Sequence, residues 1–149
     1  MNYWIFVHKG EKVDAAKTFR NIVNLGNWVF MVTKPIKNKI MSLRKDDIIV
    51  FYLGGNNCKY FAGETKLVTN AERPTRESIG DPVDYKSDYM VSFDVITEWD
   101  RKRTDLTNRD IRDKLNFIKN KDNWGMTFGQ SIIRITERDY NDIKKLING

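Results

Sequence analysis

The spacing of apolar residues along the chain predicts a series of β-strands. Between residues 89 and 99 most alternate positions are apolar, which is the period of a strand with one buried face. The predicted buried face carries Tyr89, Val91, Phe93, Val95 and Trp99. Two unbroken apolar runs, 3–7 and 48–53, are typical of strands covered on both faces. Further segments of this kind are the turn 54–57 with the returning strand 60–68, the apolar run 28–32 and a last strand, 130–135.

A helical period appears near both ends of the chain. Residues 12–25 keep apolar side chains close to one face, and Gly26 follows where a C-terminal cap belongs. Thr136 opens a final helix, with Asp139 three residues on as a weaker relative of the capping box. The apolar stripes are Val13, Ala16, Phe19 and Val23 in the first helix, and Tyr140, Ile143 and Ile147 in the second. With short helical turns expected within 108–124, the order of elements predicts an α+β fold, with helices around a curved, mostly antiparallel sheet or partial barrel.

Length and charge narrow the possibilities. The chain has 149 residues, 40% of them hydrophobic, which suits one ordinary domain covering 1–149. No apolar run approaches the ~20 residues that cross a bilayer. The opening Asn2-Tyr3-Trp4-Ile5 is typical of a strand and not of a signal peptide. We therefore expect a cytoplasmic protein with no membrane partner. Lysine and arginine exceed aspartate and glutamate by 26 to 20, and the net charge of +6 permits phosphate contacts with a polyanion.

The residues needed for common catalytic or metal sites are scarce. Cys58 is the only cysteine and His8 the only histidine, which excludes an intrachain disulfide and leaves a Cys/His zinc site short of ligands. His8 lies at the end of the first strand, where we expect a structural role. No nucleophile-elbow, Walker A or dinucleotide-binding glycine pattern occurs. We therefore expect no enzyme, no metal and no cofactor.

Tryptophans and basic stretches are the candidates for binding chemistry. Trp4 and Trp99 lie on predicted strands and are expected in the core, whereas Trp28 and Trp124 lie near loops, where an indole can stack on a base or simply be buried. The segment 33–45 carries Lys34, Lys37, Lys39, Arg44 and Lys45 with no acid before Asp46, so it can hold phosphates or be a solvated basic loop. A second segment, 117–124, adds Lys119, Asn120 and Lys121 beside Trp124, which can serve as phosphate and base-edge contacts or as a polar connection.

Several short motifs follow one another in a recognisable order, beginning with Asn2-Tyr3-Trp4-Ile5 at the start and Asn27-Trp28-Val29 after the first predicted helix. They resemble the start and the helix-to-strand tryptophan segment of EVE domains, members of the PUA-like superfamily that also contains the YTH domains. Asp46-Asp47-Ile48 to Tyr52 resembles their Gly-Asp-hydrophobic strand, with Asp46 where the family usually has glycine. The other matching segments are 37–40, 61–64, 115–121 with Trp124, 132–135 and Asp139-Tyr140, so that the resemblance spans nearly the whole chain.

The resemblance implies a PUA-like pseudo-barrel with a concave pocket for a modified base. Trp28 matches the tryptophan that forms one wall of the YTH aromatic cage, and a later loop would supply other walls, for which Tyr85 and Tyr89 are candidates. We expect Asn21, Asn24, Asn38, Asn120 and Trp124 to complete the base-binding set, with Lys34, Lys37, Lys39, Lys119 and Lys121 at phosphates.

The sequence thus predicts a nucleic-acid-binding module that recognises a modified or flipped base of RNA or DNA. Two alternatives stay open. One is a nuclease or hydrolase like the ASCH group of PUA-like proteins, which would need clustered His, Lys or carboxylate groups in the pocket. The other is a small-molecule-binding protein, which an apolar pocket with no basic rim would favour.

Overall fold

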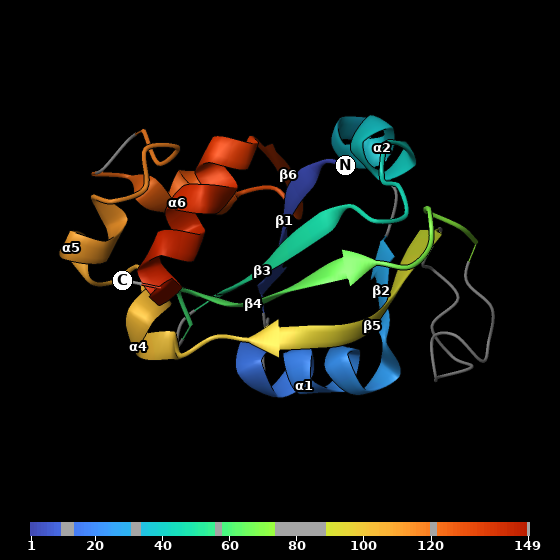
Figure 1. Cartoon of the computed structure of the whole chain (residues 1–149), viewed down its shortest axis with the longest axis horizontal. Coiled ribbons are helices and arrows are strands. Elements are labelled where there is room, and N and C mark those ends of the chain that lie inside the picture. Colours follow the sequence, from blue (N-terminus) through green and yellow to red (C-terminus); the bar gives the residue numbers. More distant parts are fainter. Residues whose placement is uncertain (10–13, 31–33, 56–57, 74–88, 120–121, 149) are drawn as a thin grey trace.

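The computed structural model describes residues 1–9, 14–30, 34–55, 58–73, 89–119 and 122–148. Within these residues six strands form one mixed, half-barrel sheet in the order β2-β5-β4-β3-β1-β6 (Figure 1). β1 runs parallel to β3, and the other neighbouring strands are antiparallel. The predicted α+β class is confirmed. The strands are β1 (Tyr3–Lys9), β2 (Asn27–Phe30), β3 (Ile48–Gly54), β4 (Tyr60–Leu67), β5 (Tyr89–Glu98) and β6 (Ile132–Ile135).

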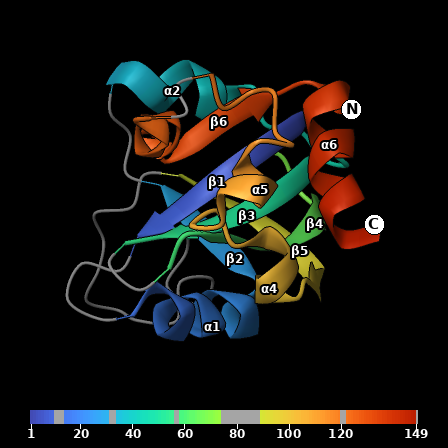
Figure 2. The same ribbon diagram turned by 90° about the vertical axis from the view of Figure 1, so that its left-hand side faces the viewer.

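Helices cover the sheet on two sides. Helices α1 and α2 lie at opposite ends of one side, and α4, α5 and α6 gather on the other (Figures 1 and 2). Among the described residues, no helix combines the length and the apolar composition that a membrane span requires. The helices are α1 (Ala15–Leu25), α2 (Lys34–Met41), α4 (Arg101–Thr104), α5 (Arg109–Arg112) and α6 (Glu137–Asn148), with a 3₁₀ turn, η1 (Trp124–Phe128).

Strand β1 is buried on both faces because its alternate side chains enter two separate cores. Trp4 and Phe6 join the cluster under α1 and α2, whereas Ile5 and Val7 join the cluster under α6. Each buried side chain of this size contributes about 1.5–3 kcal/mol, so β1 is held firmly from both sides. Its last residues, at the end of the strand, are therefore a rigid base for any site built there.

The two predicted helix caps, at Gly26 and Thr136, are present, and α1 also has an N-cap that was not predicted. The Asp14 side chain accepts a hydrogen bond from the Ala16 amide at 2.9 Å and begins α1. Gly26 ends α1 at φ 75°, in the left-handed region that favours glycine. Thr136 and Asp139 exchange hydrogen bonds between side chains and amides, which makes the capping box at the start of α6 reciprocal.

One strand face and one basic segment differ from expectation. Val95 was expected in the core but is 74% exposed. Phe93 to Ile96 takes three residue steps on β5, whereas the paired segment from Leu67 to Thr65 takes two on β4. The extra residue in β5 turns Val95 outward and Ile96 inward. The basic segment expected as a loop contains helix α2, which forms because two isoleucines four residues apart, Ile36 and Ile40, are buried on one face.

The neighbouring aspartates before β3 have opposite roles. Asp46 is exposed, with φ 75°, the left-handed conformation at the position where EVE domains usually have glycine. Asp47 is 1% exposed and accepts three hydrogen bonds, from the Asn2 amide at 2.9 Å and from the Trp4 indole and Arg44 amide at 3.0 Å. Asp47 thus joins the start of β1 to the turn before β3.

Candidate nucleic-acid interface

Trp28 is fixed in place by the aromatic core. It follows Gly26, the α1 cap, on the short strand β2. Its ring stacks on Phe51 with centroids 5.4 Å apart and planes 28° apart, and it contacts Phe6 at 5.2 Å. Only 6% of its surface is exposed. The indole is therefore a rigid wall that presents a narrow part of its surface, instead of a free platform.

A cavity of about 450 Å³ lies beside this ring. We call it the Trp28 pocket. Its walls come from the end of β1, the end of α1, all four residues of β2, Ile36 of α2 and Ser131. The volume lies within the roughly 300–1,000 Å³ typical of ligand sites. Leu25 and Val29, which are 38% and 39% exposed, give its mouth apolar surface.

His8 and Asn27 give the Trp28 pocket polar walls. His8 Nε2 forms a hydrogen bond of 2.6 Å with the Thr18 hydroxyl, whose direction depends on the tautomer of the imidazole, and the same hydroxyl lies 3.2 Å from the Ala15 carbonyl. Burial lowers the pKa of His8, which keeps the imidazole neutral at pH 7. Asn27 Oδ1 accepts from the Ser92 hydroxyl at 2.5 Å, which fixes that side chain against β5. Lys9 brings positive charge to the same walls.

Comparison with known proteins identifies the family. The sequence model of the EVE domain matches residues 2–146. The chain belongs to the EVE domain family. A search of curated protein sequences found no match.

Solved structures confirm the PUA-like fold of this EVE domain. A human THYN1 structure in complex with DNA containing 5-methylcytosine has a TM-score of 0.62 at 14% identity, covering 100% of this chain and 99% of that one. The YTH domain of MRB1 from Zygosaccharomyces rouxii, in complex with N6-methyladenosine RNA, has a TM-score of 0.55 at 17% identity, covering 97% and 86%. Rpa0253 from Rhodopseudomonas palustris has a TM-score of 0.63 at 14% identity, covering 99% and 94%.

The EVE domain brings together only part of the predicted base-binding set. Trp28 lines the pocket, whereas Asn21 and Asn24 are exposed on α1 and do not line it. Tyr89 is half-buried at the start of β5, with the Arg73 guanidinium 4.8 Å from its ring centroid. Trp124 lines a different cavity from Trp28. Tyr85, Asn120 and Lys121 lie outside the described residues.

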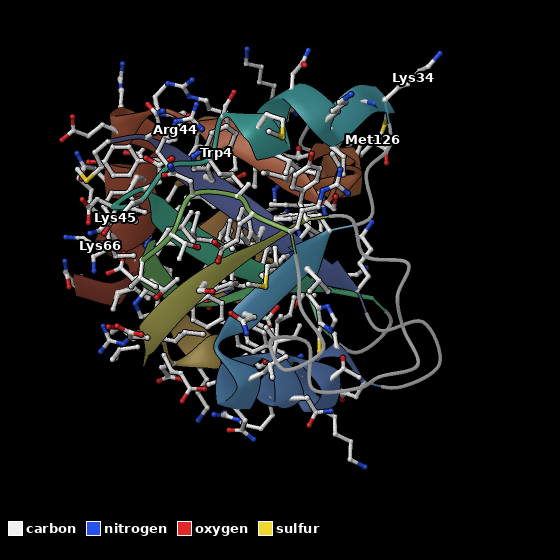
Figure 3. The ribbon with its side chains drawn as sticks, turned by 90° about the vertical axis from the view of Figure 1, so that its right-hand side faces the viewer. Trp4, Lys34, Arg44, Lys45, Lys66 and Met126 are labelled. Carbon is white, nitrogen blue, oxygen red and sulfur yellow. The ribbon has the colours of Figure 1, made fainter. Side chains whose placement is uncertain are left out.

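The predicted phosphate-binding residues are spread over α2 and beyond. Figure 3 shows Lys34 reaching into solvent at one end of α2, with Arg44 and Lys45 near its other end. Lys39 is tied down, because its amine donates to the Gln130 side chain and, at 3.4 Å, to the Ile132 carbonyl. Of the predicted residues, Lys34, Lys37 and Asn38 are exposed on α2, and Lys119 is exposed after Ile118.

Sequence reasoning missed Lys9, Asn27 and Ser131 as pocket residues and gave His8 only a structural role. Asn27 directly precedes Trp28 in the matching motif, which was a usable signal. Lys9 and Ser131 carried no such signal, because a strand end and a residue more than 120 positions later meet only through β1–β6 pairing. The pocket is thus a product of tertiary structure.

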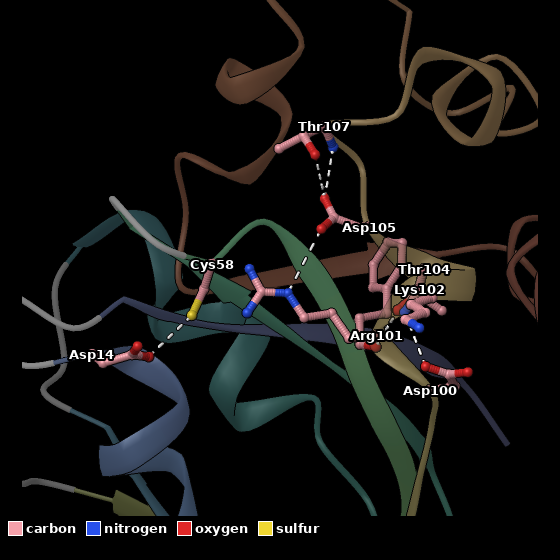
Figure 4. A network of polar contacts seen from close by, with 9 residues as sticks. Asp14, Cys58, Asp100, Arg101, Lys102, Thr104, Asp105 and Thr107 are labelled. Atoms are coloured by element: carbon pink, nitrogen blue, oxygen red, sulfur yellow. Dashed lines mark hydrogen bonds and ion pairs between the residues drawn. The ribbon is translucent and has the colours of Figure 1, made fainter.

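Cys58 is a nucleophile candidate that lies beside a carboxylate, and its surroundings disfavour reaction. The thiol is 2% exposed and donates to Asp14 Oδ1 at 3.2 Å, in a network that Figure 4 shows between α1, β4 and α4. Burial, followed by the bond to Asp14, raises the pKa of the Cys58 thiol, which disfavours the reactive thiolate. No group of three potential metal ligands occurs in the part of the chain that the structure describes.

Proposed function

We propose that this EVE domain binds RNA or DNA without cutting it and holds a modified or flipped base in the Trp28 pocket. The observation that carries the proposal is the pocket itself, which is lined by an indole and apolar side chains together with His8, Lys9 and Asn27. The methyl group of a modified base would be buried against Leu25 and Val29 and so removed from water. The polar residues that line the pocket would form hydrogen bonds with the edge of the base.

The relatives support this function. The THYN1 structure contains DNA with 5-methylcytosine, and the MRB1 structure contains RNA with N6-methyladenosine. The lysines on α2 and Lys9 place positive charge near the pocket, where phosphates of the strand would pass. Flipping a base out of a duplex costs a few kcal/mol, so a strand that is already unpaired should be the tighter-binding ligand.

The test is a binding comparison by fluorescence anisotropy. DNA with one 5-methylcytosine, RNA with one N6-methyladenosine and their unmodified counterparts are titrated at 50 and 200 mM salt. We expect one modified oligonucleotide to bind more tightly than its counterpart, and affinity to fall with salt because phosphate contacts release counterions. Incubation with end-labelled strands should leave them intact.

The variant must block the pocket without removing core. Trp28→Ala would cost about 3–5 kcal/mol of stability, because the ring is buried. Ser131→Trp adds a ring at an exposed wall position instead, and Thr97→Trp, exposed on β5, is its matched control. We expect Ser131→Trp to lose the preference for the modified base and Thr97→Trp to keep it. Equal affinity of the wild type for modified and plain strands, or an unchanged preference in a folded Ser131→Trp protein, would contradict the proposal.

A further inference from the structure

A second cavity, of about 510 Å³, lies around Trp124, and we call it the Trp124 hollow. Its floor is formed by Tyr52 and Phe128, whose rings stack at 3.8 Å with planes 9° apart. Both of these rings are buried, whereas Trp124 is only half-buried and stands as a wall. The aromatic surface that the hollow exposes to solvent is therefore mainly that of Trp124.

The Trp124 hollow and the Trp28 pocket are neighbours, because Lys9 lines both. A small third cavity, of about 210 Å³, shares Val7, Lys9 and Ser131 with the Trp28 pocket. It shares Lys9 and Phe128 with the Trp124 hollow. Lys9 is exposed and is the last residue of β1, which ends in the arrowhead at the left of Figure 2. We call these three neighbouring cavities, which have Lys9 in common, the trough.

The charges differ among the cavities of the trough. The Lys59 amine lies 5.6 Å, and the Arg112 guanidinium 5.0 Å, from the Trp124 ring centroid. Asp122 and Asn123 also line this hollow. The Asp122 carboxylate can accept hydrogen bonds from the amino groups of a base, and Lys59 adds a positive charge at the same hollow. Among the described residues, the small cavity is lined by Lys9 and by no acid, so it suits a phosphate, and the Trp124 hollow suits a base.

We propose that the trough holds the nucleotide next to the modified base, with its base against Trp124 and the linking phosphate at Lys9. The proposal rests on the proposed function, and it makes the recognised unit a dinucleotide step of a single strand instead of one base. Aromatic stacking tolerates every base because each has a π-face, so Trp124 would add affinity with little sequence preference. Lys59 would follow the phosphate of that second nucleotide.

The test compares ligands of increasing length by calorimetry. The free modified nucleoside is measured against dinucleotides that carry the modified base at the 5′ or the 3′ position. We expect one of the two dinucleotides to bind at least tenfold more tightly than the nucleoside, since one stacked base and one phosphate are added. Lys9→Gln should weaken the binding of that dinucleotide and reduce the slope of log affinity against log salt concentration by about one. Its control is Lys17→Gln, at an exposed position on α1, which should change neither quantity.

A blocking variant separates this subsite from the first one. An added Cβ at Gly125 meets no atom within 4 Å, so Gly125→Trp can fill the Trp124 hollow with no clash at the backbone. Its control is Met126→Trp, at a 70% exposed position on the same turn. We expect Gly125→Trp to reduce dinucleotide affinity to that of the nucleoside and Met126→Trp to keep it. Trp124→Leu should act like Gly125→Trp, and thermal melting checks that each variant is folded.

The possible failures are distinct. If Gly125→Trp and Trp124→Leu bind the dinucleotide like the wild type while Ser131→Trp does not, the second subsite is refuted and the Trp28 pocket stands. Equal affinity of nucleoside and both dinucleotides for the wild type refutes it as well. If no modified nucleoside or oligonucleotide binds at all, both proposals fall.

Discussion

The adjacent aspartates 46 and 47 should respond to substitution in opposite directions. Asp47→Asn keeps the shape of a buried side chain but replaces one carboxylate oxygen with an NH₂ group. The three groups that face the carboxylate are all donors, from Asn2, Trp4 and Arg44. An amide can turn its oxygen toward only some of them, so at least one N–H is left facing another N–H.

The size of the effect follows from these contacts. A hydrogen bond to a charged group contributes about 1.5–3 kcal/mol, and a buried donor without a partner costs about 1–3 kcal/mol. We expect Asp47→Asn to lose about 3 kcal/mol of unfolding free energy, or roughly 6–12 °C in Tm for a chain of this length. Asp46→Gly relieves a left-handed conformation that costs an L-residue about 1–2 kcal/mol, against about 0.5–1 kcal/mol of glycine entropy, so it should gain about 0.5 kcal/mol.

Urea unfolding followed by tryptophan fluorescence measures both variants, and each serves as the other's control. Both remove one negative charge at neighbouring positions, so a general charge effect would move them together. A shift of the same sign in both, or a loss below about 1 kcal/mol in Asp47→Asn, would refute this account of the buried carboxylate.

Two further predictions concern single titratable groups. Because burial lowers the pKa of His8, the unfolded chain takes up its proton first, so unfolding free energy should fall as pH drops from about 6.5 toward the folded pKa. His8→Gln should remove this pH dependence of the unfolding free energy. In two-dimensional ¹H–¹³C spectra, the ring signals of the one histidine should shift with a midpoint below pH 6.5. A midpoint at or above 6.5 would count against burial of the ring. Cys58 should react slowly with a thiol reagent at pH 8 when folded and at once in urea, since it is 2% exposed and its pKa is raised, and rapid labelling of the folded protein would show otherwise.

Much of the secondary structure could be predicted because local patterns determine it. The run Tyr3 to Val7 and the caps at Gly26 and Thr136 act within a few residues, and the structure has all of them. The helix at 34–41 was missed because basic residues dominate its composition, and its two buried isoleucines count only once the sheet lies beneath them. Val95 was misplaced because a bulge depends on the partner strand.

The candidate site was predictable only in its central residue. The segment Asn27-Trp28-Val29 indicated Trp28, but the polar walls come from the ends of β1 and β2 and from Ser131. The asparagines at 21 and 24 were plausible by proximity in sequence, yet helix α1 turns them to solvent. Strand order and register decide which side chains meet across a pocket. The local pattern of residues in the sequence specifies neither of them.

The sequence by itself determined the family, the α+β class and the both-sided burial of β1, because motif order and apolar spacing are properties of the chain alone. Only the tertiary structure decided that Asp47 is buried while Asp46 is strained at the surface, and that Trp28 and Trp124 line separate cavities that have Lys9 in common. The physical reason is that burial and hydrogen bonding depend on which distant segments cover a residue, so identical neighbours in sequence can differ completely in environment.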